Sequence, residues 1–146
     1  MRFPTHVAAV IGLAGCLALG SSSAAQQAQT SGEKTVIPAN ASALEGVPAV
    51  RLDVKKDAAM RRQLDGDEAA RQTLKIKVDN GKYFWATREN VPLKLTTSGE
   101  FTYLSAEPGQ YIRLRKVNGK IEYVEHVDKE WESVTWWGEL RIVVKK

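Results

Sequence analysis

Apolar and polar residues alternate with a period of two through the second half of the chain. Leu74, Ile76 and Val78 alternate with lysines, which predicts a strand with one buried face because successive side chains point to opposite sides. Asn80-Gly81 follows and predicts a two-residue hairpin turn, since both turn residues need positive φ. The return strand is expected at 82–87, and further runs cover 92–97, 100–105, 110–117, 120–127, 133–137 and 139–144. This pattern predicts an antiparallel meander of about seven or eight strands, forming a small barrel or a sandwich.

The residues before the meander have a different pattern. Asp57 can cap a helix in which Met60 and Leu64 share one face, and a second helical piece can start at Asp67. We therefore expect one or two short helices ahead of the sheet, within a single α+β, mostly β domain at 50–146. Residues 26–49 are rich in Ala, Ser, Gln, Gly and Pro without an apolar period, which predicts a flexible linker.

Residues 1–25 have the three parts of a secretory signal peptide. Arg2 precedes an uncharged run, and small residues ending at Ala25 provide a cleavage site. The apolar run is shorter than the roughly 20 residues of a membrane-spanning helix. Within it, Leu13-Ala14-Gly15-Cys16 resembles the lipobox of bacterial lipoproteins, so lipidation of Cys16 is the alternative to an ordinary signal. Both interpretations predict an exported, periplasmic or secreted protein, whose membrane contact would be a lipid anchor at Cys16.

Charge and cysteine content exclude several function classes. Cys16 is the one cysteine of the 146 residues, so no disulfide, thiol nucleophile or cysteine-based metal site is expected in the domain. The formal charge of +4 falls by one if Arg2 leaves with the signal, and basic and acidic residues are interspersed. This mild balance disfavours nucleic acid as a partner. We expect no metal and no cofactor.

Aromatic residues are concentrated in the predicted sheet. Tyr83-Phe84-Trp85 and Trp136-Trp137 place aromatic side chains on both faces of their strands. Those that point outward can stack on sugar rings or pack against a partner protein, whereas those that point inward fill the core. Trp85, Trp136 and Trp137 are therefore candidate ligand-binding residues.

Three polar or charged residues share one face of the run 110–117. Tyr111, Arg113 and Arg115 alternate with apolar residues, and arginine can bind two oxygens of a carboxylate or phosphate. The alternative is a solvated face, because a turn at Asn118-Gly119 places Arg115 opposite Glu122 as a cross-strand ion pair. These three residues complete the candidate ligand-binding set.

His126 is the one histidine outside the signal, and Glu125 precedes it. Together they are the weak candidates for catalysis, since a histidine with a carboxylate can act as a general base. No motif of a nucleophile, zinc site or phosphate-binding loop surrounds them. The sequence thus favours a non-catalytic binding or structural module of the bacterial cell envelope, with a protein or glycan ligand. The alternatives are a small exported enzyme using His126, and a binder of anionic polymers along Arg113, Arg115 and Arg141.

Overall fold

The computed structural model describes residues 34–145, and nine antiparallel strands with one short helix account for most of them. The strands are β1 (Ala41–Lys55), β2 (Ala58–Gln63), β3 (Leu74–Asp79), β4 (Lys82–Trp85), β5 (Val91–Ser98), β6 (Phe101–Ser105), β7 (Gln110–Val117), β8 (Lys120–Lys129) and β9 (Glu132–Val144), and the helix is α1 (Gly66–Arg71). The predicted signal peptide, Cys16 and the first part of the predicted linker lie outside the described residues.

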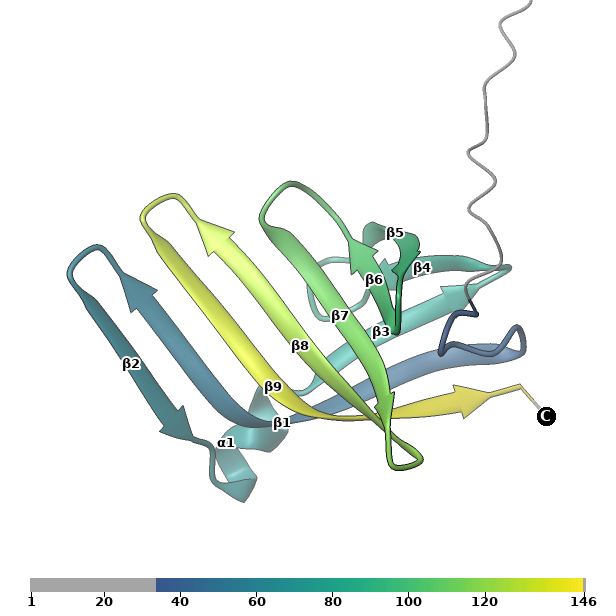
Figure 1. The fold of residues 1–146 in the computed structure, drawn as a ribbon, viewed down its shortest axis with the longest axis horizontal. Helices are drawn as coiled ribbons and strands as arrows, with labels where there is room; N and C mark the ends of the chain where they lie inside the picture. The colour runs from purple at the N-terminus through teal and green to yellow at the C-terminus, as the bar shows by residue number, and fades with distance from the viewer. Residues whose placement is uncertain (1–33, 146) are drawn as a thin grey trace, which may run out of the picture.

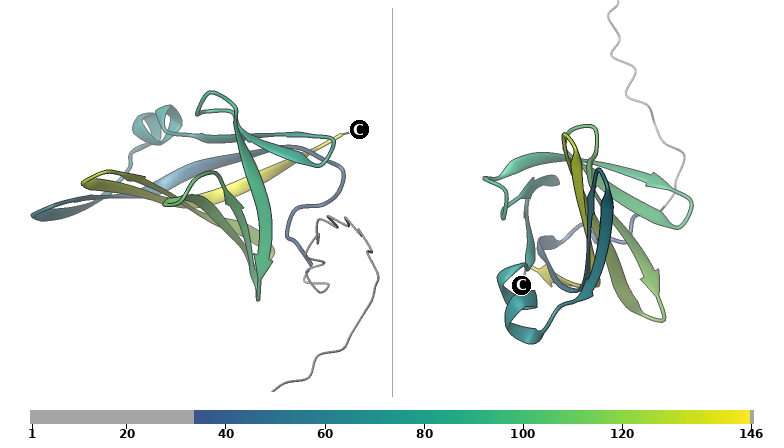
Figure 2. Two further views of the ribbon diagram at one scale, coloured as in Figure 1. Left: turned by 90° about the horizontal axis from the view of Figure 1, so that it is seen from above. Right: turned by 90° about the vertical axis from the view of Figure 1, so that its left-hand side faces the viewer.

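The sheet closes into a barrel. Neighbours in the order β1-β3-β4-β5-β6-β7-β8-β9 are hydrogen-bonded, and β9 pairs with β1 to complete eight strands, with β2 as an extra strand on β1 (Figure 1). The prediction of a mostly β antiparallel meander is confirmed, and of the two predicted arrangements, barrel and sandwich, the structure has the barrel. The long strands β1 and β9 continue past the closed part, so with β2 and β8 they form an extended sheet on one side of the barrel (Figures 1 and 2).

The two hairpins predicted from Asn-Gly are present. Asn80, Gly81, Asn118 and Gly119 all have positive φ, as a two-residue hairpin turn of this type requires. The turn at Asn118 sets the predicted register, in which Arg115 lies opposite Glu122.

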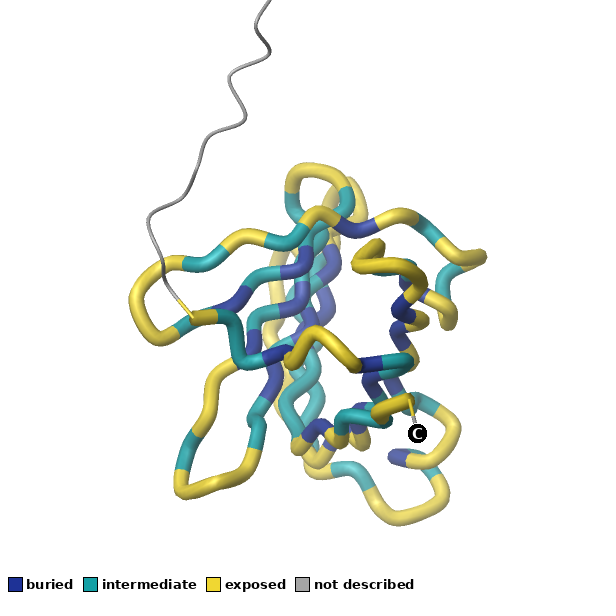
Figure 3. Tube along the Cα trace, turned by 90° about the vertical axis from the view of Figure 1, so that its right-hand side faces the viewer, coloured by how far each residue is buried: buried dark blue, intermediate teal, exposed yellow. Residues whose placement is uncertain are grey.

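The core follows the alternation of the strands. Leu74, Ile76, Ile112 and Leu114 are fully buried, and their strand neighbours point outward. Figure 3 shows this alternation along the strands, with exposed positions gathered in the turns. One end of the barrel is filled by the segment before β1, where Ile37 is buried and the Val36 amide donates to Thr102 Oγ1 at 3.2 Å.

Three local expectations were wrong. The predicted linker already contains the buried Ile37, and β1 begins at Ala41 inside it. The predicted helix after Asp57 is strand β2, because backbone pairing with β1 outweighs the helical preference of its Ala, Met and Arg residues. The runs 133–137 and 139–144 were predicted as two strands, but they form one, because β9 continues through Gly138 from Glu132 to Val144. The helical piece near Asp67 is present as α1, capped by Asp65.

Candidate functional site

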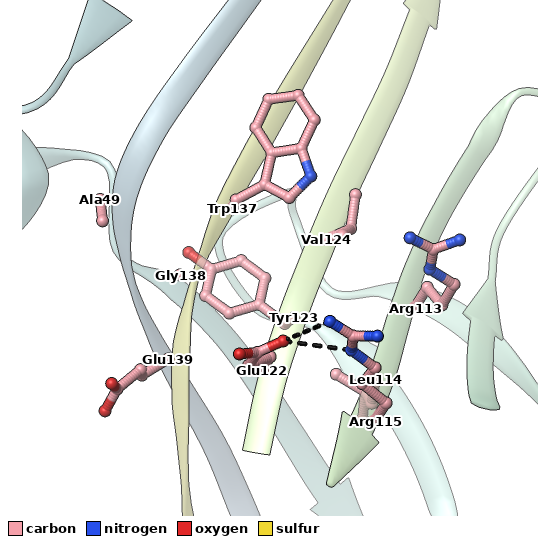
Figure 4. Close-up of a pocket in the computed structure, with 10 residues that line it drawn as sticks. All are labelled: Ala49, Arg113, Leu114, Arg115, Glu122, Tyr123, Val124, Trp137, Gly138 and Glu139. Carbon is pink, nitrogen blue, oxygen red and sulfur yellow. Dashed lines mark hydrogen bonds and ion pairs between the residues drawn. The ribbon is translucent and has the colours of Figure 1, made fainter. Parts of the chain in front are cut away.

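A groove on the outer surface of the barrel brings together three of the predicted ligand-binding residues. Arg113 and Arg115 project from β7 and Trp137 from β9, with Val124 of β8 between them (Figure 4). The strand pairing explains this proximity, because Arg113 lies opposite Val124 and Val124 lies opposite Trp137. The groove has a volume of about 400 Å³. We call it the outer groove; its lining is completed by Ala49, Leu114, Glu122, Tyr123, Gly138 and Glu139.

The charges of the outer groove balance one another. The Arg115 guanidinium donates to Glu122 through Nε at 3.1 Å and Nη2 at 2.9 Å, and Lys120 Nζ lies 2.7 Å from Glu139 Oε1. The ion pair predicted between Arg115 and Glu122 is thus confirmed. Arg113 instead lies over the ring of Phe101, with 4.9 Å between Cζ and the ring centroid. The groove therefore offers planar polar groups beside an indole ring without a strong excess of either charge.

Tyr123 lies beneath the outer groove and points into the barrel. Its ring is fully buried, and its hydroxyl has no hydrogen-bond partner among the described residues. Burial, together with the charge of Glu125, raises the pKa of this phenol. The ring fits only because Gly46 faces it, since a Cβ at Gly46 would lie 2.6 Å from Tyr123 Cε1.

Aromatic rings continue from the groove along the outer face of β6, β7 and β8. Phe101 to Tyr103 and Tyr103 to Tyr111 have centroid separations of 6.3 Å, and Tyr111 lies 5.1 Å from the His126 ring. These rings are half-buried against each other. Tyr111 therefore belongs to this row, next to the groove and outside its lining.

His126 and Glu125 cannot act together, because they point to opposite sides of β8. Glu125 is buried inside, whereas His126 lies on the outer face. His126 Nδ1 is 2.8 Å from Thr135 Oγ1 and Nε2 is 3.1 Å from Asp128 Oδ1. These three hydrogen-bonded side chains resemble a catalytic relay of hydroxyl, histidine and carboxylate. However, β8 and β9 each pair with a neighbouring strand on both edges. Their backbone amides are thus engaged in the sheet, and these two strands supply no oxyanion-binding pair beside His126.

No family model, curated protein sequence or solved structure matches this chain.

Trp85 and Trp136 lie inside the barrel, away from the outer groove. Trp85 is fully buried and belongs to the core. Trp136 is half-buried, and its Nε1 donates to Gln72 Oε1 at 2.7 Å. The six predicted ligand-binding residues are therefore divided among the groove, the aromatic row and the interior.

A second cavity opens where Trp136 reaches the end of the barrel beside α1. It has a volume of about 360 Å³ and is lined by Arg51, Arg71, Gln72, Thr73, Thr87, Arg88, Glu125 and Trp136. We call it the mouth cavity. Arg88 Nη2 donates to Glu125 Oε1 at 3.0 Å, and the Arg88 guanidinium lies 4.7 Å from the Trp85 ring centroid. Burial raises the pKa of the Glu125 carboxyl, although the hydrogen bond and charge of Arg88 act in the opposite direction.

Most residues of the mouth cavity could not be predicted from local sequence patterns. Arg51 lies in a strand that starts inside the predicted linker, and Arg88 lies between β4 and β5. Only the pairing of β1 with β9 brings Arg51 opposite Trp136, and this pairing joins positions 85 residues apart in sequence.

The described residues hold no group of three or more His, Cys, Asp and Glu side chains arranged to bind a metal ion. Within the same part of the chain, no helix is long and apolar enough to cross a membrane.

Proposed function

We propose that this protein is an exported, non-catalytic binding module of the bacterial cell envelope whose outer groove binds a glycan. The observation that carries this proposal is the position of Trp137 beside the planar polar side chains of Arg113, Arg115 and Glu122 in one groove. Indole rings pack against the C–H faces of sugars. Guanidinium and carboxylate groups supply the donors and acceptors that sugar hydroxyls need.

The charge balance of the groove supports a glycan over an anionic polymer. Arg115 and Lys120 are already paired with Glu122 and Glu139, and affinity for a polyanion depends on uncompensated cations. Arg141, the third member of the predicted arginine stripe, is paired with Glu45 and lines a different surface hollow. The separation of His126 from Glu125 likewise favours binding over catalysis.

The test uses the mature protein with isolated peptidoglycan and with soluble N-acetylglucosamine oligomers. We expect saturable binding that Trp137→Ala or Arg113→Gln weakens by about tenfold or more, corresponding to about 1.4 kcal/mol. The control is Trp131→Ala, because Trp131 is 78% exposed in the β8–β9 turn and lies outside the groove.

Absence of saturable binding to either glycan would overturn the proposal. So would an equal loss in the Trp131 variant, which would indicate non-specific aromatic adsorption. Capture of an envelope protein through Trp137 without glycan binding would assign the groove to a protein partner instead.

A further inference from the structure

The mouth cavity carries a concentration of arginine that the outer groove does not explain. Arg51 comes from β1, Arg71 from α1 and Arg88 from the β4–β5 connection, and Glu125 is the one carboxylate in the lining. We propose that the mouth cavity binds a small carboxylate-bearing molecule through Arg71 and Arg88. This site is separate from the outer groove, because Glu125 and Trp136 point to the interior side of β8 and β9 while Trp137 points outward.

Contacts within the protein engage Arg51, whereas Arg71 and Arg88 remain available to a ligand. Arg51 donates to both oxygens of Asp53 and, through Nη1, to Gln72 Oε1 at 3.1 Å, so its guanidinium is largely engaged. Arg88 makes one ion pair, with Glu125, and its buried Nε has no hydrogen-bond partner among the described residues. Arg71 is exposed, and no carboxylate of the described chain lies within ion-pair distance of it.

These contacts leave positive charge at the cavity. Arg88 Nε is buried, so a bound carboxylate would meet the Nη groups of Arg88 and the exposed guanidinium of Arg71. Arginine is suited to this role because its fork of donors matches the two oxygens of a carboxylate. The hydroxyls of Thr73 and Thr87 line the same cavity and offer neutral hydrogen-bonding groups.

The size and walls of the cavity define the class of ligand. A volume of about 360 Å³ lies at the lower end of the range for small-molecule sites. The Trp136 indole forms an apolar wall, and the guanidinium groups of Arg51 and Arg88 lie 5.3 Å and 5.8 Å from its ring centroid. A compact carboxylate with a flat apolar body satisfies both the arginines and this wall.

Glu125 couples the site to pH. The groups facing it are Arg88 from the β4–β5 connection, the Arg51–Asp53 pair of β1, Arg71 of α1 and Tyr123 of its own strand. When Glu125 is protonated, the cavity loses its one lining negative charge and Arg88 loses its charged partner. A carboxylate ligand should therefore bind more tightly as pH falls through the raised pKa of Glu125, and the test compares pH 7 with pH 5.5.

The test titrates the mature protein with benzoate, a carboxylate that remains ionised at both pH values. The readout is the indole N–H resonance of Trp136, assigned with the Trp136→Phe variant. We expect a saturable shift and an affinity that Arg71→Gln lowers at least tenfold. Because Arg71 is exposed and outside any ion pair of the described residues, this substitution should leave the fold intact.

The matched control is Arg61→Gln. Arg61 is also exposed and forms no ion pair with the described residues, but it lies on β2 opposite Leu52, away from the cavity lining. An unchanged affinity in this variant supports the proposal. No saturable shift, or equal losses in the Arg61 and Arg71 variants, would overturn it, and weaker binding at pH 5.5 than at pH 7 would overturn the role assigned to Glu125.

Discussion

At the scale of single residues, alternation along β8 places the Glu125 side chain inside the barrel and the His126 side chain on its outer face. The two neighbours were only weak candidates for catalysis, and in the structure Glu125 is paired with Arg88 instead. The same alternation predicts correctly that Tyr111, Arg113 and Arg115 share the outer face. The side of the sheet on which each side chain lies was thus predictable within a strand. Which residues meet across strands was predictable only where a two-residue turn fixes the register, as it does for Arg115 and Glu122.

The burial of Glu125 predicts a pH-dependent stability. Its pKa is raised in the folded protein, so the folded state retains a proton that the unfolded state releases. The contribution of Glu125 to the free energy of unfolding should therefore fall as pH rises from the usual carboxyl pKa, about 4.3, through the raised value, and then level off. Urea unfolding of the wild type and of Glu125→Gln at several pH values measures this. A stability difference between the two proteins that does not change with pH would contradict the assignment.

At the scale of elements, the long strands β1 and β9 bend together (Figure 1). A bulge in β1 at this bend explains why the sequence pattern did not predict β1 as a strand. The register shifts between Pro48 and Val50, so the inward positions change from Leu44, Gly46 and Pro48 to Arg51 and Asp53. The bulge interrupts the period of two, and Gly, Pro and charged residues occupy inward positions. Such a sequence lacks the regular alternation of a strand and therefore predicts a linker.

Gly138 allows β1 and β9 to approach closely at this bend. A Cβ at this position would overlap Val47 O and lie 2.8 Å from Pro48 Cα, both of them backbone atoms that cannot rotate away. We therefore expect Gly138→Ala to lower the free energy of unfolding by about 1–3 kcal/mol or more, measured by urea denaturation. Gly66→Ala is the control, because a Cβ there meets nothing within 4 Å, and it should change stability by less than about 1 kcal/mol. Equal effects of the two substitutions would show that close packing at the bend is unimportant.

At the scale of the whole molecule, local signals predict the meander from β3 to β9, but they predict neither β1 and β2 nor the closure of the barrel. Each hairpin pairs neighbours in sequence, whereas the seam joins Leu44 of β1 to Ile142 of β9. Nothing in the local pattern specifies this contact, so the sequence alone does not distinguish a barrel from a sandwich. The seam also places Arg51 beside Trp136 in the mouth cavity, which explains why Arg51 was not predicted as part of a site.

Closure predicts that the last strand is needed for cooperative folding. A chain ending at Gly138 lacks Leu140, which is 7% exposed in the core, and leaves the first part of β1 paired with β3 alone. We expect this truncated protein to lose the single cooperative transition in thermal unfolding followed by circular dichroism, whereas a chain ending at Lys145 keeps it. A cooperative transition in the shorter chain would show that the barrel is stable without its seam.

The extra strand β2 has a consequence for how this protein behaves at high concentration. β2 is hydrogen-bonded to β1 on one side and has no second neighbour among the described strands. Its outer edge therefore presents backbone groups that a strand from another molecule could extend. Arg61 is exposed on this strand and its charge opposes the approach of an identical edge, whereas Arg62 is already paired with Glu68. Arg61 thus disfavours edge-to-edge self-assembly at the strand edge that the barrel leaves open.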